Sequence, residues 1–127
     1  MNDIEVISTP DAPAALGPYS QALRANGVIY CSGQVPLDPK TGQIVEGGIE
    51  AQTRRVLANL RAVLRAAGSD FDRLLQTTVY LTDMNDFATV NAICTELYAG
   101  AKPTRSCVQV AALPRGAKIK IDAIAVC

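Results

Sequence analysis

The chain has 127 residues, of which 49% are hydrophobic, and its 12 basic and 12 acidic residues give no net charge at neutral pH. This balance fits one globular domain spanning residues 1–127 and argues against both a disordered chain and a strongly basic nucleic-acid-binding protein. Histidine is absent, which excludes a Ser-His-Asp triad and a histidine-based metal hydrolase.

The sequence shows no pattern typical of a secretory signal peptide or a membrane-spanning segment. Its N-terminal segment has acids and prolines where a secretory signal needs a basic start and an apolar core, and no run of about 18 apolar residues follows. Four cysteines show neither the CxxC spacing of metal and redox sites nor the density of a disulfide scaffold: Cys31, Cys94, Cys107 and Cys127. We expect a cytoplasmic protein with free thiols.

Two strands joined by a tight turn are predicted first. The segment SQALRANGVIYCSG has two half-apolar runs on either side of Asn26-Gly27, a dipeptide that tolerates the positive φ angles of a hairpin turn. The segment PLDPKTGQIVEGG is typical of a loop. A helix is then predicted from Ile49 to Ala67, because apolar residues recur at helical spacing and Gly68 provides a C-terminal stop.

The second half of the chain predicts a strand, a helix and a strand pair. Residues 73–83 (RLLQTTVYLTD) are rich in β-branched and aromatic side chains, as expected of a strand. The next helix has four side chains on its core face: Phe87, Val90, Cys94 and Leu97. Two final strands, 105–112 and 118–126, are expected to pair as a hairpin. The fold class is therefore α+β, with a mixed sheet and both helices on one face.

Alternation along the last two strands predicts two different faces. The face away from the helices is expected to hold Arg105, Cys107, Gln109, Lys120, Asp122, Ile124 and Val126. The face under the helices is expected to hold Val108, Val110, Ile119 and Ile121. Because a monomer would expose the apolar members of the outward face, we expect a homo-oligomer with sites at the seams between subunits.

Five long segments carry a resemblance to a known family. They are GPYSQA (17–22), YCSGQVPLDPKTG (30–42), TTVYLTDMNDFATVN (77–91), PTRSCVQVAALP (103–114) and KIKIDAIAV (118–126). In this order they resemble the reactive intermediate deaminases, also called the Rid, RidA-like or YjgF family, and several long motifs in order are a specific signal. The resemblance implies a chorismate-mutase-like fold that assembles as a homotrimer around a barrel-like core.

The resemblance also implies an activity. Such proteins hydrolyse enamines and imines released by pyridoxal-phosphate enzymes, such as 2-aminoacrylate, 2-iminopropanoate and 2-iminobutanoate, to 2-oxo acids and ammonia, with no cofactor or metal. By matching motif, Arg105 is expected to grip the substrate carboxylate while a placed water attacks the imine carbon beside Cys107. The rest of the pocket is expected to be formed by Tyr19, Ser32, Gly33 and Asn91.

Physical chemistry supports some of these roles and offers alternatives to others. The guanidinium fork of Arg105 matches a planar carboxylate with two parallel hydrogen bonds, although an ion pair with Asp122 across a subunit seam is the alternative. Cys107 has no histidine to activate it and is assigned to the pocket wall. Tyr19 is alternatively a packing aromatic, and Asn91 a polar residue on a helix surface.

The last segment departs from the family pattern. Deaminating members usually read KIEIEAIAV where this chain reads KIKIDAIAV, so Lys120 replaces a glutamate believed to position the attacking water, and Asp122 replaces a second acid. A lysine with a reference pKa of about 10.4 does not act as a base at neutral pH unless its pKa is strongly depressed. In a final hairpin, Lys120 is expected opposite Cys107.

Three alternatives follow from this replacement. In the first, Lys120 pairs with an acid such as Asp122, and slow water-driven deamination continues. In the second, Arg105 and Lys120 form a doubly cationic cleft that selects a dianionic substrate. In the third, hydrolysis is lost and the trimer senses ligands or binds proteins. A nucleic-acid role ranks lower, because zero net charge and few aromatic residues provide little electrostatic attraction or stacking.

Overall fold

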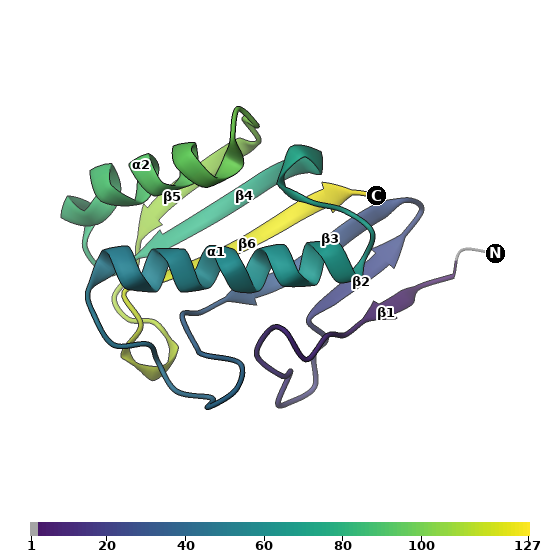
Figure 1. Ribbon diagram of the computed structural model, residues 1–127, viewed down its shortest axis with the longest axis horizontal. Helices are drawn as coiled ribbons and strands as arrows, with labels where there is room; N and C mark the ends of the chain where they lie inside the picture. Colours follow the sequence, from purple (N-terminus) through teal and green to yellow (C-terminus); the bar gives the residue numbers. More distant parts are fainter. Residues whose placement is uncertain (1–2) are drawn as a thin grey trace.

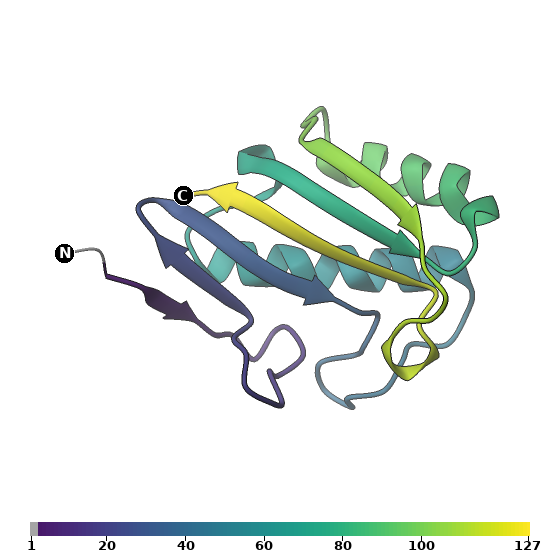
Figure 2. The same ribbon diagram turned by 180° about the vertical axis from the view of Figure 1, so that it is seen from behind.

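A six-stranded mixed sheet is the centre of the computed structural model, which describes residues 3–127. In chain order the helices and strands are β1 (Glu5–Ile7), β2 (Ala22–Ala25), β3 (Val28–Gln34), α1 (Ile49–Ala66), β4 (Leu74–Leu81), α2 (Phe87–Tyr98), β5 (Thr104–Gln109) and β6 (Ile119–Val126). Both helices lie on one face of the sheet (Figure 1). The opposite face is not covered by any helix (Figure 2). This arrangement confirms the predicted α+β class.

The strand order is β1-β2-β3-β6-β4-β5, which corrects the predicted final hairpin. β5 pairs in parallel with β4, and β6 is inserted between β3 and β4, antiparallel to both. The prediction that the last two strands pair with each other is therefore wrong. The physical reason is the crossover through α2, because a helix that joins two strands places them side by side and parallel.

The side chains of β5 also face opposite to the prediction. Arg105 is the partner of Thr77 on β4, and Cys107 is the partner of Val79. Partnered residues of neighbouring strands point to the same face of a sheet, and Thr77 and Val79 are buried under the helices. Arg105 and Cys107 therefore point toward the helices, and the prediction that they share the outward face with Lys120 is wrong.

Val108 in β5 also faces opposite to the prediction, whereas the residues of β6 face as predicted. Val108 lies on the outward face and is 43% exposed, so the prediction that it packs under the helices is wrong. In β6, buried and half-buried residues alternate as predicted, with Ile119 and Ile121 fully buried beneath the helices and Lys120 and Asp122 on the outward face. β6 is a central strand whose inward face must be apolar, whereas β5 lies at the edge and tolerates polar residues there.

The first hairpin and α1 form where they are predicted. Asn26 and Gly27 have φ angles of 54° and 76°, and they join β2 to β3. Helix α1 begins at Ile49 and ends one residue before the predicted Ala67, and its fully buried face consists of Val56, Leu57, Leu60, Val63 and Leu64. The short strand β1 is absent from the prediction. Within residues 3–127, no helix is both long and apolar enough to cross a membrane.

Candidate functional site

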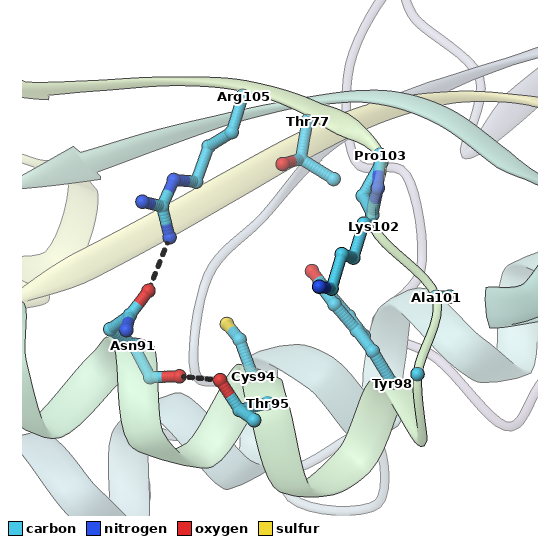
Figure 3. Close-up of a pocket in the computed structure, with 10 residues that line it drawn as sticks. Thr77, Asn91, Cys94, Thr95, Tyr98, Ala101, Lys102, Pro103 and Arg105 are labelled. Carbon is cyan, nitrogen blue, oxygen red and sulfur yellow. Dashed lines mark hydrogen bonds between the residues drawn. The ribbon is translucent and has the colours of Figure 1, made fainter.

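Arg105 points from β5 toward α2, where two uncharged groups hold it (Figure 3). Its Nη1 donates a hydrogen bond to Asn91 Oδ1 at 2.7 Å, and its Cζ lies 5.0 Å from the centre of the Phe87 ring. These contacts orient the guanidinium without neutralising its charge, because an amide and an aromatic ring have no net charge. Among residues 3–127 no carboxylate forms an ion pair with Arg105, which leaves its charge available to an anion.

A cavity of about 350 Å³ opens beside Arg105, between α2 and the start of β5. This volume lies near the lower end of the range of ligand pockets, which is about 300–1,000 Å³. Its lining includes Thr77, Asn91, Cys94, Tyr98, Lys102 and Arg105. Two cationic residues and no acidic residue of the described chain line it, so the cavity is suited to a small anion.

Cys107 follows Arg105 on the same face of β5 but does not line this cavity. It is half-buried against the hydrophobic core. Burial raises the pKa of the Cys107 thiol, although the nearby charge of Arg105 opposes this effect. The thiol is therefore protonated at neutral pH and is not a ready nucleophile.

Tyr19 and Ser32 lie in a different part of the molecule. They line a separate cavity of about 460 Å³ formed by the loop before β2 and by β3. Tyr19 is 55% exposed, so it is not a packing aromatic in this chain. The Ser32 hydroxyl donates a hydrogen bond to the Ser20 carbonyl oxygen at 2.6 Å, which fixes the β3 end of this cavity.

Gly33 and Lys120 contact each other on the outward face of the sheet. The β3–β6 register shifts between Cys31 and Gln34, and a Cβ on Gly33 would clash with Cε of Lys120, so the side chain of Lys120 lies across the glycine. The Lys120 ammonium lies 5.3 Å from the centre of the Tyr80 ring. The expected position of Lys120 opposite Cys107 is wrong, because β4 separates their strands and their side chains point to opposite faces.

Asp122 lies near Lys120 on the outward face but bonds to a different side chain. Its Oδ2 accepts a hydrogen bond from the Tyr80 hydroxyl at 3.0 Å. Within the described chain neither Lys120 nor Asp122 takes part in an ion pair. The pairing of Lys120 with Asp122, which the sequence left open, is thus not formed in this chain.

The expected site residues therefore fall into two groups. The first, which we call the arginine group, consists of Asn91, Arg105 and Cys107 on the helix side of β5. The second, which we call the lysine group, consists of Tyr19, Ser32, Gly33 and Lys120 around β3. One chain does not bring the two groups together, because β6 and β4 separate β3 from β5.

Of the residues that line the cavity beside Arg105, only Asn91 and Arg105 were expected in the site from the sequence. Among those missed, Thr77 lies in a strand, Cys94 was assigned to the core, and Tyr98 and Lys102 follow at the end of α2 and in the next loop. The usable signals were the place of Thr77 in a family segment and the closeness of Lys102 to Arg105 in the chain. Among residues 3–127, no three Cys, Asp or Glu side chains are grouped so as to hold a metal ion.

Comparison with known proteins identifies the family. Residues 9–127 match the model of a protein family described as Endoribonuclease L-PSP. The chain belongs to this family, also called the Rid or YjgF family. A mouse Rid relative, 2-iminobutanoate/2-iminopropanoate deaminase, is 54% identical to the chain over 122 residues, covering 96% of the chain and 90% of the mouse protein.

Solved structures of Rid proteins have the same fold. The Rid protein YyfA of Yersinia pestis has a TM-score of 0.96 and 47% identity, covering 98% of this chain and 100% of that protein. TdcF of E. coli, solved with bound serine, has a TM-score of 0.92 and 41% identity, covering 97% of this chain and 99% of TdcF. Because these structures cover 98% and 97% of this chain, the likeness includes α2 and β5, which carry the arginine group.

Proposed function

We propose that this Rid protein hydrolyses small 2-imino acids and their enamine tautomers, including 2-aminoacrylate, 2-iminopropanoate and 2-iminobutanoate. The name of the mouse relative supports this reaction class, and the serine bound to TdcF supports a site for a small amino-acid-like molecule. The observation that carries the proposal is the geometry of Arg105. Its guanidinium is held by Asn91 and Phe87, carries no ion pair within residues 3–127, and adjoins a cavity without acids.

For imine hydrolysis, the main task of the protein is to orient the substrate. Arg105 holds the substrate carboxylate through paired hydrogen bonds, which fixes the adjacent imine carbon. A water oxygen then adds to that carbon of the protonated imine, the electron pair of the C=N bond moves to nitrogen, and one proton of the added water passes to bulk water. The resulting carbinolamine transfers its hydroxyl proton to the amine, which leaves as ammonia, and a 2-oxo acid remains. Because the protonated imine is already electrophilic, this step needs no nucleophilic side chain.

The complete site, in our proposal, forms between chains of a homotrimer. The arginine group of one chain and the lysine group of the next would then face one another across a seam, which one chain alone does not achieve. The uncovered sheet face supports assembly because Tyr30 and Val108 there are 50% and 43% exposed. The substrates would be supplied by pyridoxal-phosphate enzymes of the cytoplasm.

A second candidate function follows from Lys120. An ammonium lies over Tyr80 where deaminating relatives are expected to carry a glutamate, so this chain lacks that base in the lysine group. The trimer would then bind imino or oxo acids at Arg105 without accelerating their hydrolysis. The two functions share the same carboxylate site and differ only in turnover.

The test is the removal of Arg105. We expect wild type to accelerate the loss of freshly generated 2-iminobutanoate over buffer, and Arg105→Ala to lower kcat/KM by about 10- to 100-fold, because two charge-assisted hydrogen bonds are lost. Arg73→Ala, which removes an exposed arginine far from the cavity, should retain wild-type kcat/KM. If wild type does not accelerate the loss of 2-iminobutanoate over buffer but still binds 2-oxobutanoate, only the binding function is supported. Full activity in Arg105→Ala contradicts both functions.

A further inference from the structure

Two buried hydroxyl groups in the cavity beside Arg105 have no nitrogen or oxygen partner. Thr77 is only 1% exposed and its Oγ1 bonds to no group among residues 3–127, and the buried Tyr98 Oη has beside it only the Cys94 thiol, whose sulfur is a weak acceptor. Figure 3 shows the Thr77 hydroxyl directed into the space between Arg105 and α2. Buried polar groups are almost always satisfied in native proteins, so two unpartnered donors in one cavity point to a ligand that supplies acceptors.

The charges around these hydroxyls indicate the kind of acceptor. Lys102, on the segment between α2 and β5, is exposed at the rim, and Arg105 forms another part of the wall. Burial raises the pKa of both Cys94 and Tyr98, so these two groups are neutral at physiological pH. The described lining thus supplies two positive charges and several donors but no negative charge, as an anionic acceptor requires.

We propose that this cavity binds the side-chain carboxylate of a short 2-imino dicarboxylate whose 1-carboxylate, next to the imine carbon, is held by Arg105. The inference rests on the proposed function, since it takes Arg105 as the anchor of the carboxylate next to the imine. It also assigns a different second cation to the doubly cationic cleft, which was one of three alternatives from the sequence. Within one chain, the second cation of the cleft is Lys102, because Lys120 lies on the opposite face of the sheet.

Each lining group has a part in this selection. The hydroxyls of Thr77 and Tyr98 donate to the oxygens of the second carboxylate, and the flexible Lys102 adds its charge from the rim. A substrate with a methyl or ethyl side chain would leave both hydroxyls buried and unpaired. Sites with buried polar groups reject ligands that lack the matching group, so the cavity should prefer dicarboxylates over monocarboxylates.

The experiment measures binding of two stable 2-oxo acids of equal chain length, 2-oxoglutarate and 2-oxopentanoate, by isothermal titration calorimetry. We expect wild type to bind 2-oxoglutarate about tenfold more tightly, because hydrogen bonds to a charged group are among the stronger ones. Lys102→Gln and Thr77→Val should each reduce this preference at least about threefold. Thr77→Val preserves shape, and circular dichroism checks its fold. Lys40→Gln, the same change at an exposed loop lysine outside the cavity, should keep the full preference.

Three results overturn the inference. Equal affinity of wild type for both acids, with both lost in Arg105→Ala, removes the dicarboxylate pocket but leaves the proposed function intact. A preference that survives in Lys102→Gln and in Thr77→Val means that the second carboxylate binds elsewhere. If wild type binds neither acid, the inference and the carboxylate site of the proposed function fail together.

Discussion

Cys107 shares a strand face with Arg105, but its surroundings keep it a neutral thiol. Burial raises its pKa more than the positive charge of Arg105 lowers it, and the sequence has no histidine to accept its proton. A nucleophilic cysteine needs the opposite balance, with a thiolate stabilised by a nearby cation or base. The surroundings of Cys107 therefore do not favour a covalent step on its thiol.

A non-covalent role predicts a mild effect for Cys107→Ser. We expect kcat/KM for 2-iminobutanoate to fall by less than about tenfold, because no covalent step is lost. The pH–rate profile between pH 6 and 9 should keep the wild-type shape, since burial raises the pKa of the thiol and keeps it protonated in this range. A fall in kcat/KM as large as that caused by removing a catalytic nucleophile would contradict a non-covalent role for Cys107. The disappearance of an alkaline limb from the pH–rate profile would contradict it too.

At the scale of single residues, the sequence predicted some members of the site but not their contacts. Arg105 and Asn91 were each expected in the site from their motifs, but their 2.7 Å contact joins a strand to a helix and depends on packing. Tyr98 and Lys102 lie outside the family segments, and Thr77 lies in one but was not singled out, because a cavity is created by what neighbouring elements leave unfilled.

At the scale of secondary structure, the junction after α1 is held by one carboxylate. Asp70 accepts hydrogen bonds from the Phe71 backbone N–H at 2.8 Å, from Arg61 Nε at 2.9 Å and from Arg65 Nε at 3.1 Å. Burial alone would raise the pKa of Asp70, but these donors outweigh it and hold the pKa below its usual value. The ionised form therefore stabilises the turn from α1 into β4.

Because the ionised form of Asp70 stabilises the fold, we expect Asp70→Asn to lower the free energy of unfolding in a pH-dependent way. Because the folded pKa is depressed below the unfolded value of about 3.9, the stabilisation is complete above that pH and is lost as pH falls through the folded pKa. We expect Asp70→Asn to lower the free energy of unfolding by about 1 kcal/mol at pH 7, after allowing for solvent screening. The difference should shrink toward pH 3.

Urea denaturation at both pH values, at one fixed protein concentration, measures this difference. Asp72→Asn, a neighbouring exposed aspartate outside the hydrogen-bond network, is the matched control and should behave as wild type. An Asp70→Asn deficit that is the same at pH 3 and pH 7 would show that charge plays no part.

The elements themselves were predictable to different degrees. Helix α1 was predicted to within one residue, because five fully buried side chains repeat at helical spacing. The pairing of β5 with β4 was not predicted. Alternation of apolar and polar residues shows that a segment is a strand, but it does not show which strand it pairs with or which of its faces the helices cover. The three residues of β1 are too few to show any alternation.

For the whole molecule, the uncovered sheet face and the divided site have a common explanation in assembly. Tyr30 and Ile124 are paired on that face, where Tyr30 is 50% exposed. A trimer would cover such groups and bring the lysine group of one chain to the arginine group of another. From the sequence, the apolar residues of the outward face predicted a homo-oligomer, and the family resemblance predicted a trimer.

In our proposal, Arg105 receives the carboxylate of a small imino or oxo acid at a seam between chains. A crystal structure of the protein soaked with 2-oxobutanoate tests this most directly. We expect both carboxylate oxygens within hydrogen-bond distance of the Arg105 guanidinium, with Ser32 and Lys120 supplied by a second chain. Arg105 paired with a protein carboxylate such as Asp122 of another chain, and the ligand bound elsewhere, would contradict it.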